Sequence, residues 1–377
     1  MARDLDLDQL EPVEDGEDNT SKPILVFVHT LPEILIGANG VACLSLAFMS
    51  FFGRNPARYG GLSFYDSCVK DFEANTDSKL SYMNFASFLL VAIERFFNET
   101  TSTVGGSLVF YSLLVLFAGI ILSVQLELNR HGVLNSVGRK GGLIAATFPL
   151  FAQVIGPATA FSFLLFWFWR AKRIHAGPRP ARDAPMNEVD LRKNVLAIIT
   201  CLSILGLVFG MRYAETSSGV VPDHLTLPLI LLLLLVPVIP SLPQAFFLQQ
   251  PSSQHSKPTR RIIGVATIAT FLLVGAAGMS VHSHGFSKYD FLLKSKGGQA
   301  VADAIVQDSL SAAPARFMFV QFVHLMIASL MFCMTETKGT GGAGLIIFVT
   351  TLVGPAGAFG LIAAHHEFQK MKDDGLI

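Results

Sequence analysis

Long apolar runs separated by short polar segments dominate the chain. A helix needs about 20 predominantly apolar residues to cross a bilayer. Eight runs are long enough, and they cover about 24–52, 105–126, 142–169, 194–213, 225–248, 261–282, 316–335 and 342–365. The pattern therefore predicts an all-α fold, a polytopic membrane helix bundle with about eight transmembrane helices.

Two shorter segments fit the membrane surface better than a span. Residues 83–93 form an apolar run of only eleven residues before Glu94, a length that suits an interfacial or re-entrant helix better than a span. Residues 299–310 are amphipathic, with Val301, Ile305 and Leu310 roughly on one face. We expect both to be interfacial helices that act as lid segments of the bundle.

A short element occurs twice in the chain. Residues 154–161 read VIGPATAF, and residues 352–359 read LVGPAGAF. Each element lies in a run that begins at a Gly-Gly pair, and the preceding run ends in a carboxylate, Glu127 or Glu336. The pattern predicts an internal repeat with halves of about 24–169 and 261–366, linked by helices within 194–248. The alternative is chance similarity, because Gly and Pro are frequent in membrane helices.

Corresponding runs of the two halves lie five predicted spans apart. Because this number is odd, we expect the halves to be inverted relative to the membrane, an arrangement that commonly encloses a site near mid-depth. Pro157 and Pro355 lie inside the repeated elements, and each removes a backbone donor and frees a carbonyl group. The two kinks either open a central cavity or accompany close packing through small residues.

The low charge content agrees with a membrane protein. Charged residues make up 15% of the chain, against about 25% in soluble domains. A soluble enzyme, a nucleic-acid binder and a disordered chain are all disfavoured. Eight acids and one base lie within residues 1–18, so we expect 1–21 to be a disordered acidic tail. Residues 22–367 then form a single transmembrane bundle, and 368–377 a polar C-terminal tail.

The basic residues predict the orientation of the bundle. Loop 170–193 holds seven bases, and loop 249–261 holds three bases and no acid. Two predicted helices separate these loops, so both lie on one side, which the positive-inside rule assigns to the cytosol. The side of the N-terminus depends on whether 83–93 spans the membrane, and the sequence leaves it open.

Three carboxylates lie in or at the ends of apolar runs. Glu33 follows Pro32 near the start of the first run, and Glu127 and Glu336 end the runs before the repeated elements. Ionisable residues inside spans usually face a cavity or the bundle interior. A carboxylic acid that is removed from water stays protonated more readily and can act as an acid. The alternative for all three is a wetted residue at a helix end.

Polar and aromatic residues mark candidate substrate contacts. Asn39 follows Glu33 on the same run, and Gln321 and His324 belong to a polar stripe on 316–335. A hydrogen-bonded core histidine is the alternative for His324. Aromatic ring faces can stabilise a cation, so we expect further contacts from a minority of the aromatic residues, namely Phe161, Trp167, Phe322 and Phe359.

Motifs for metals and cofactors are missing from the sequence. His365, His366 and Glu367 lack the i, i+4 histidine pair of a helical metal site, and we interpret them as a solvated helix end. No Walker A loop, GxGxxG element or DDxxD run is present. We therefore expect neither a metal site nor a cofactor.

Several of these features occur together in one group of proteins. The repeated element with its aromatic extension (GPATAFSFLLFWFWRAKR and GPAGAFGLIAAHHEF), the span count, the length and the run LPLILLLLLVPVIPSLP resemble one fungal family. These are the integral-membrane terpene cyclases of meroterpenoid biosynthesis, of the ascochlorin and ascofuranone type. The likeness covers most of 24–367. It implies a metal-independent cyclase of the endoplasmic reticulum that acts on a prenylated aromatic with a terminal epoxide.

The candidate residues suit such a reaction. An acid opens an epoxide by protonating its oxygen, and we assign this role to Glu336, with Glu127 as partner or proton acceptor and Glu33 as the next candidate. A dry, aromatic-lined cavity would shield the resulting carbocation from water. The expected partners are a lipophilic substrate and membrane lipid, without nucleic acid. A small-molecule transporter and a non-catalytic receptor or scaffold are the alternatives.

Overall fold

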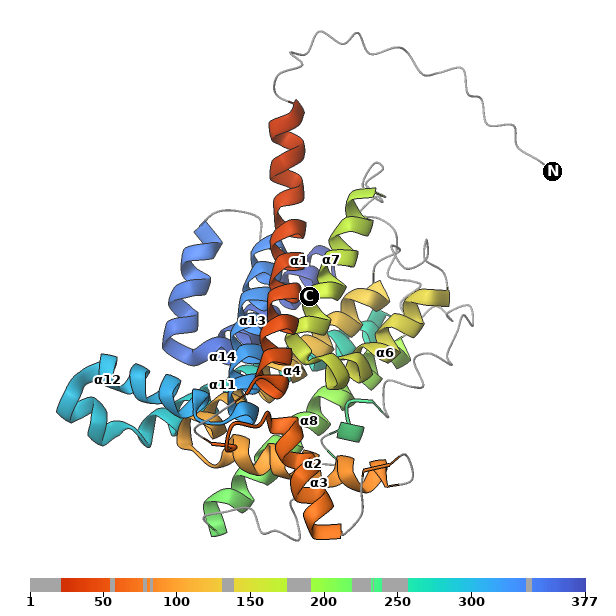
Figure 1. Ribbon diagram of the computed structural model, residues 1–377. Coiled ribbons are helices and arrows are strands. Elements are labelled where there is room, and N and C mark those ends of the chain that lie inside the picture. The colour runs from red at the N-terminus through yellow and green to blue at the C-terminus, as the bar shows by residue number, and fades with distance from the viewer. Residues whose placement is uncertain are drawn as a thin grey trace.

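The protein is helical throughout the part that can be described. The computed structural model describes residues 22–54, 58–76, 80–81, 84–130, 139–174, 191–218, 232, 234–238, 257–336 and 341–377. Within these ranges no residue forms a strand, and Figure 1 shows a bundle of helices. The helices are α1 (Lys22–Phe52), α2 (Phe64–Thr76), α3 (Phe85–Thr101), α4 (Val104–Arg130), α6 (Arg139–Ile155), α7 (Pro157–Ile174), α8 (Leu191–Ser218), α11 (Lys257–Ser287), α12 (Asp290–Leu310), α13 (Ala313–Glu336) and α14 (Gly341–Asp373).

Five of the described helices are long and apolar enough to cross a membrane. These candidate spans are Glu33–Phe52, Val104–Leu126, Asn194–Tyr213, Lys257–Ser287 and Ala313–Cys333, and each coincides with a run predicted from the sequence. The protein is therefore a helical membrane protein. Most of the predicted span 225–248 lies outside the described residues, as do 1–21. The segments expected to be lids fall in α3 and α12, which are not among the candidate spans.

Helix α4 forms the centre of the bundle. Every residue from Gly105 to Leu126 is buried, because α8, α11, α13 and α14 all pack against this helix. Its sequence is apolar on all sides, as expected for a helix that is surrounded by protein. In contrast, α1 fully buries only one narrow stripe at intervals of three and four residues, and most of its other residues from Ile34 to Phe52 are exposed. The stripe consists of Glu33, Ile36, Gly40, Cys43, Ala47 and Ser50.

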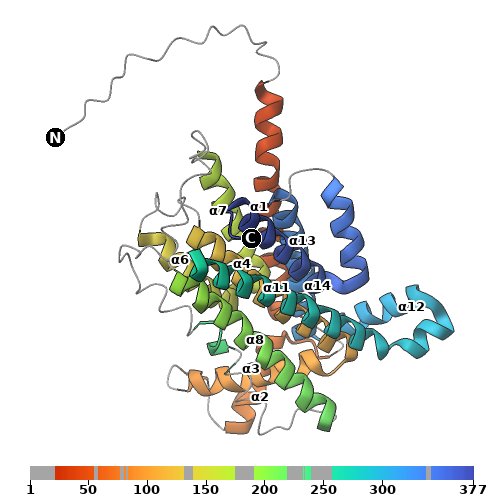
Figure 2. The ribbon, with the colours of Figure 1, turned by 180° about the vertical axis from the view of Figure 1, so that it is seen from behind.

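Both repeated elements break their helix at the glycine before the proline. Gly156, between α6 and α7, has a φ of 90°, and Gly354, inside α14, has a φ of 77°. A residue that precedes proline is pushed out of the helical region, and only glycine adopts a positive φ without strain. The predicted span 142–169 is therefore two helices, of which α6 packs against α7. In α14 the limbs before and after Gly354 point in different directions (Figures 1 and 2).

Equivalent helices of the two predicted halves make equivalent contacts. In the first half α1 packs against α7 and against α13, and in the second half α11 packs against α14 and against α4. Helices α1 and α13 are antiparallel, since Asn39 contacts His324 and Phe51 contacts Phe317. Helices α11 and α4 are antiparallel in the same way, since Gly119 lies against Val274 and Gly285 against Leu108.

The expectation of inverted halves is wrong. Near their first residues, α4 and α13 are linked by a hydrogen bond from Thr103 to the carbonyl of Asp308 (3.3 Å). Near their ends, Ser123 and Cys333 line one pocket, so the two helices run in the same direction. Helix α7 also runs along α13, from Ala158 beside Gln321 onward. An unbroken span after α4 would run antiparallel to α4, whereas α7 runs parallel to it. The prediction of inverted halves failed because 142–169 was counted as one span.

Candidate functional site

The first break is filled by an amide side chain from another helix. Gln321 of α13 is fully buried, and its Oε1 accepts a hydrogen bond from the backbone N–H of Ala158 (3.0 Å). This bond satisfies a donor that the start of α7 leaves open. A Cβ atom on Gly156 would lie only 2.2 Å from Nε2 of Gln321. Within the described residues this Nε2 has no hydrogen-bond partner, which leaves a donor directed at the break.

The other polar residues predicted from the sequence gather beside this break. Asn39 of α1 donates from its Nδ2 to Oγ of Ser162 on α7 (3.0 Å) and to the carbonyl of His324 on α13 (3.1 Å). The ring Nδ1 of His324 lies 2.9 Å from the carbonyl of Val320. Asn39, Gln321 and His324 therefore join three helices at one level of the bundle. We call Asn39, Ser162, Gln321 and His324 the polar seam.

Glu33 is a buried carboxyl residue of α1. It is only 6% exposed and lies on the buried stripe of α1, less than two helical turns before Asn39. A carboxyl group at this position is enclosed by the bundle instead of wetted at a helix end. The structure thus places Glu33 in the interior, as the functional interpretation requires.

A pocket lies about three turns farther along α13 than Gln321, between α4, α11, α13 and α14. Its volume is about 20 Å³, and three phenylalanine rings contribute to its wall. Phe271 comes from α11, Phe332 from α13 and Phe359 from α14. The remaining lining residues are Ser123, Cys333, Ile362, Ala363, His366, Glu367 and Lys370. Aromatic rings and ionisable groups thus line one pocket, which is partly open, since the side chain of Lys370 at its edge is 38% exposed.

Glu367 is the pocket residue that the sequence interpretation missed. It is 5% exposed and lies 3.6 Å from Nζ of Lys370, so the interpretation of a solvated helix end is wrong for this residue. The signal was present in the spacing, since Gly360, Ala364, Glu367 and Met371 are buried at intervals of four, three and four residues. His365, by contrast, is exposed as expected.

The two carboxylates favoured from the sequence lie at the pocket end of their helices. Glu127 is in the last turn of α4, four residues after Ser123, and Glu336 ends α13, three residues after Cys333. Both side chains lie outside the described residues. The backbone brings the ends of these two helices to the pocket.

The four predicted aromatic contacts separate into different environments. Phe359 lines the pocket, and Phe161 is fully buried with its ring 6.0 Å from that of Phe332. Phe322 is partly buried on α13. Trp167 is 65% exposed and therefore lies on the outside of the bundle, away from both the pocket and the polar seam.

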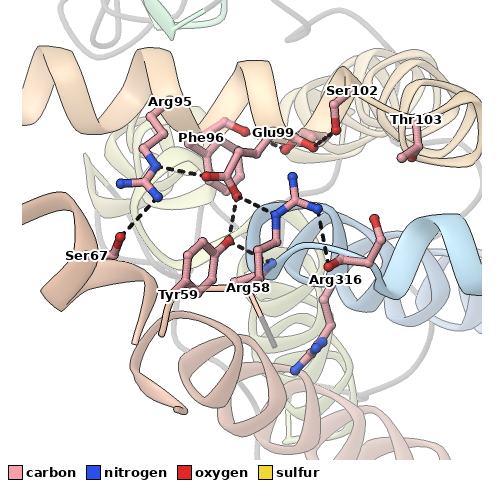
Figure 3. A network of polar contacts seen from close by, with 12 residues as sticks. Arg58, Tyr59, Ser67, Arg95, Phe96, Glu99, Ser102, Thr103 and Arg316 are labelled. Carbon is pink, nitrogen blue, oxygen red and sulfur yellow. Dashed lines mark hydrogen bonds and ion pairs between the residues drawn. The ribbon is translucent and has the colours of Figure 1, made fainter. Parts of the chain in front are cut away.

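A polar network outside the candidate spans also escaped the sequence interpretation. Tyr59, which precedes α2, donates to Oε2 of Glu99 on α3 (2.5 Å). Nε of Arg95 donates to Oε1 of the same carboxylate (2.8 Å), and Nε of Arg58 lies 3.8 Å from Oε2 (Figure 3). Burial and the adjacent Glu99 raise the pKa of Tyr59, so its hydroxyl remains a donor. The i, i+4 spacing of Arg95 and Glu99 was the available sequence signal.

The comparisons with known proteins assign no family to this architecture: no family model, curated protein or solved structure matches the chain.

Proposed function

We propose that the protein is a membrane-embedded terpene cyclase that protonates the terminal epoxide of a prenylated aromatic substrate and cyclises it through a carbocation. The observation that carries the proposal is the pocket between α4, α11, α13 and α14, where phenylalanine rings and the buried Glu367 share one space. The reaction requires an acid, a base and an aromatic wall, and the carboxylate of Glu367, paired with Lys370, suits the base. The resemblance in sequence adds the substrate class and a location in the endoplasmic reticulum.

The acid step needs a carboxyl group that is protected from water. In the proposed reaction a carboxylic acid gives its proton to the epoxide oxygen, and the bond from that oxygen to the more substituted carbon breaks. A double bond or hydroxyl group of the substrate then attacks the cationic carbon, and a base accepts the proton that is lost. Glu367 lines the pocket, Glu127 lies in the last turn of α4, and Glu336 is the last residue of α13. Glu336 and Glu127 are our candidates for the acid and Glu367 for the base, and the buried Glu33 of α1 is a further candidate for the acid.

The pocket wall suits the cationic intermediate. Ring faces of phenylalanine attract a cation by about 0.5–2 kcal/mol each, most strongly where water is excluded. The described pocket, at about 20 Å³, has room for roughly one water molecule. A prenyl chain therefore binds only after the surrounding helices separate, and it reaches them from the bilayer, in which it dissolves.

Turnover of a defined substrate tests the proposal. Microsomes that contain the protein are incubated with a farnesylated phenol carrying a terminal epoxide, and the products are analysed by mass spectrometry. We expect an isomer of unchanged mass. Glu336→Gln and Glu367→Gln should abolish its formation while membrane insertion is preserved. Asp303→Asn, at an exposed position of α12, is the matched control and should retain activity. Unchanged substrate with wild-type protein, or full turnover in both glutamine variants, would refute the proposal.

A small-molecule transporter is the second candidate. The observation in its favour is that α14 and the α6–α7 pair are both broken at a glycine of positive φ, since broken helices in repeated halves are typical of transporters. In sealed vesicles a transporter would accumulate the labelled epoxide without changing its structure. A cyclase would convert the same probe to an isomer even in detergent, where no gradient exists.

A further inference from the structure

Two buried tyrosines lie just outside the candidate spans, and each donates to a carboxylate. The hydroxyl of Tyr59 donates to Glu99 (2.5 Å), and the hydroxyl of Tyr289 donates to Oδ2 of Asp308 (2.7 Å). Both rings are less than 9% exposed. Tyr59 and Glu99 stand at the two ends of the segment that contains α2 and α3. Tyr289 and Asp308 stand at the two ends of α12. We call them the first and the second tyrosine–carboxylate pair.

The two carboxylates occupy equivalent positions in the predicted repeat. Glu99 precedes Val104, the first residue of α4, by five positions, and Asp308 precedes Ala313, the first residue of α13, by the same number. A serine follows each carboxylate after three residues and donates to its carbonyl, at 2.9 Å for Ser102 and 2.7 Å for Ser311. Asp308 follows Glu99 by 209 positions, and Glu336 follows Glu127 by the same 209 positions.

Each pair contacts the helix of the opposite half. The hydroxyl of Tyr59, from the first half, accepts from the N–H of Ala313 at the start of α13 (3.3 Å). Oδ2 of Asp308, from the second half, accepts from the N–H of Gly105 at the start of α4 (3.4 Å). Both acceptors satisfy open donors at a helix N-terminus, where negative charge is also favourable. The pair of each half thus contacts the first residues of a helix in the other half.

The two pairs lie side by side. The hydroxyl of Thr103, next to α4, donates to the carbonyl of Asp308 (3.3 Å). Nη1 of Arg58, labelled in Figure 3, donates to the carbonyl of Ser311 (3.5 Å). The first pair is further held by Arg95, which also donates to Asp71 and to Oγ of Ser67 on α2. Glu99 therefore links α2 and α3 to the beginning of α13.

We infer that the two tyrosine–carboxylate pairs anchor the segments outside the candidate spans to the end of the bundle where α4 and α13 begin. The first pair anchors α2 and α3, and the second pair anchors α12. Loss of one pair frees its own segment and leaves the bundle folded. A buried hydrogen bond to a charged acceptor is among the stronger ones in proteins. Without it, α12 keeps few buried residues and α2 and α3 keep only their own hydrophobic cluster, so each segment opens locally more often. Such opening exposes this end of the bundle without unfolding the core.

Hydrogen–deuterium exchange of the full chain in detergent micelles tests this inference. Tyr59→Phe should raise the exchange of α2 and α3 by about tenfold or more and leave α12 unchanged. Tyr289→Phe should produce the reverse pattern. Tyr65→Phe is the matched control, because Tyr65 is an exposed tyrosine of α2, and it should change neither segment.

Two outcomes would overturn the inference. One is exchange in Tyr59→Phe and Tyr289→Phe that equals that of Tyr65→Phe. The other is faster exchange throughout α4 and α13, which would mean that the pairs support the core and do not fasten separate segments. If Tyr59→Phe fails to fold, Glu99→Gln removes the charge of the same pair with a side chain of equal size, and the same criteria apply.

Discussion

At the scale of single residues, one glycine determines the direction of the chain at each break. Gly156 and Gly354 adopt positive φ values, 90° and 77°, which the following proline favours by excluding the helical conformation. The space at these positions is also limited, since a Cβ on Gly354 would lie 2.9 Å from Nδ1 of His282. Conformation and packing therefore both require glycine.

This requirement predicts a large effect of a small change. Gly156→Ala should lower the free energy of unfolding by about 1–3 kcal/mol from backbone strain, with a further loss from the clash with Gln321. Gly206→Ala is the control, because Gly206 is helical and has open space around it, so alanine there should be neutral or stabilising. Thermal unfolding in detergent measures both. Equal melting temperatures for the two variants would contradict the argument.

A second residue prediction concerns the buried thiol of Cys68 on α2. Burial raises its pKa from 9.0 to about 11, so the folded protein holds this proton more tightly than the unfolded chain. The resulting stabilisation is complete below pH 9 and is lost as the pH rises through 11. At pH 8 the thiolate fraction of Cys68 should be about 100-fold lower in the folded than in the denatured protein. Alkylation by iodoacetamide, followed by mass spectrometry, should be correspondingly slower at Cys68 in the folded than in the denatured protein. Equal rates would refute this.

At the scale of elements, small residues decide which helix faces meet. Residues 35–40 of α1 read LIGANG and residues 273–278 of α11 read LVGAAG, a second similarity between the halves. Gly40 lies against Phe163 of α7, and Gly278 against the backbone of α14 at Gly357. Close approach of backbones through small residues is a common mode of packing in membranes.

Two glycines of α11 provide a matched test of this packing. A Cβ on Gly278 would lie 2.4 Å from the backbone nitrogen of Gly357, whereas a Cβ on Gly275 would make ordinary contacts at 3.5 Å. Gly278→Ala should therefore destabilise the protein by about 1–3 kcal/mol through overpacking, and Gly275→Ala should be tolerated. Detergent unfolding of both variants measures the difference. An intact Gly278→Ala variant would show that α11 and α14 can move apart.

At the scale of the whole molecule, the contacts settle which ends of helices lie together. Helices α1 and α7 are antiparallel, since Gly37 lies against Phe166 and Gly40 against Phe163. The beginning of α1 is therefore at the end of α7, where the basic loop 170–193 follows. The positive-inside rule then predicts a cytosolic N-terminus, with α2, α3 and α12 on the opposite side.

Protease protection in intact microsomes tests this orientation. A tag at the N-terminus and a tag within 175–190 should both be cleaved by protease added from outside. A tag inserted between Gly297 and Gly298 of α12 should survive until detergent opens the membrane. An N-terminal tag that is protected together with the α12 tag would contradict the arrangement.

The sequence alone determined the class of protein and identified several of the polar residues that lie between its helices. Hydropathy identified the five helices that are candidate spans, because the cost of exposing backbone and polar groups to lipid restricts a membrane chain to long apolar helices. Isolated polar residues on such helices also pointed correctly to the interior, as Asn39, Gln321, His324 and Glu33 show.

Tertiary structure alone decided the directions and the partners. A run such as 142–169 has the same hydropathy whether it crosses once or turns back at Gly156, because hydropathy records burial and not direction. Glu367 was interpreted as solvent-exposed because its burial depends on helices distant in sequence. The pairs Tyr59–Glu99 and Tyr289–Asp308 likewise join residues 40 and 19 positions apart. Contacts of this kind depend on the shape of the folded chain, which local sequence patterns do not specify.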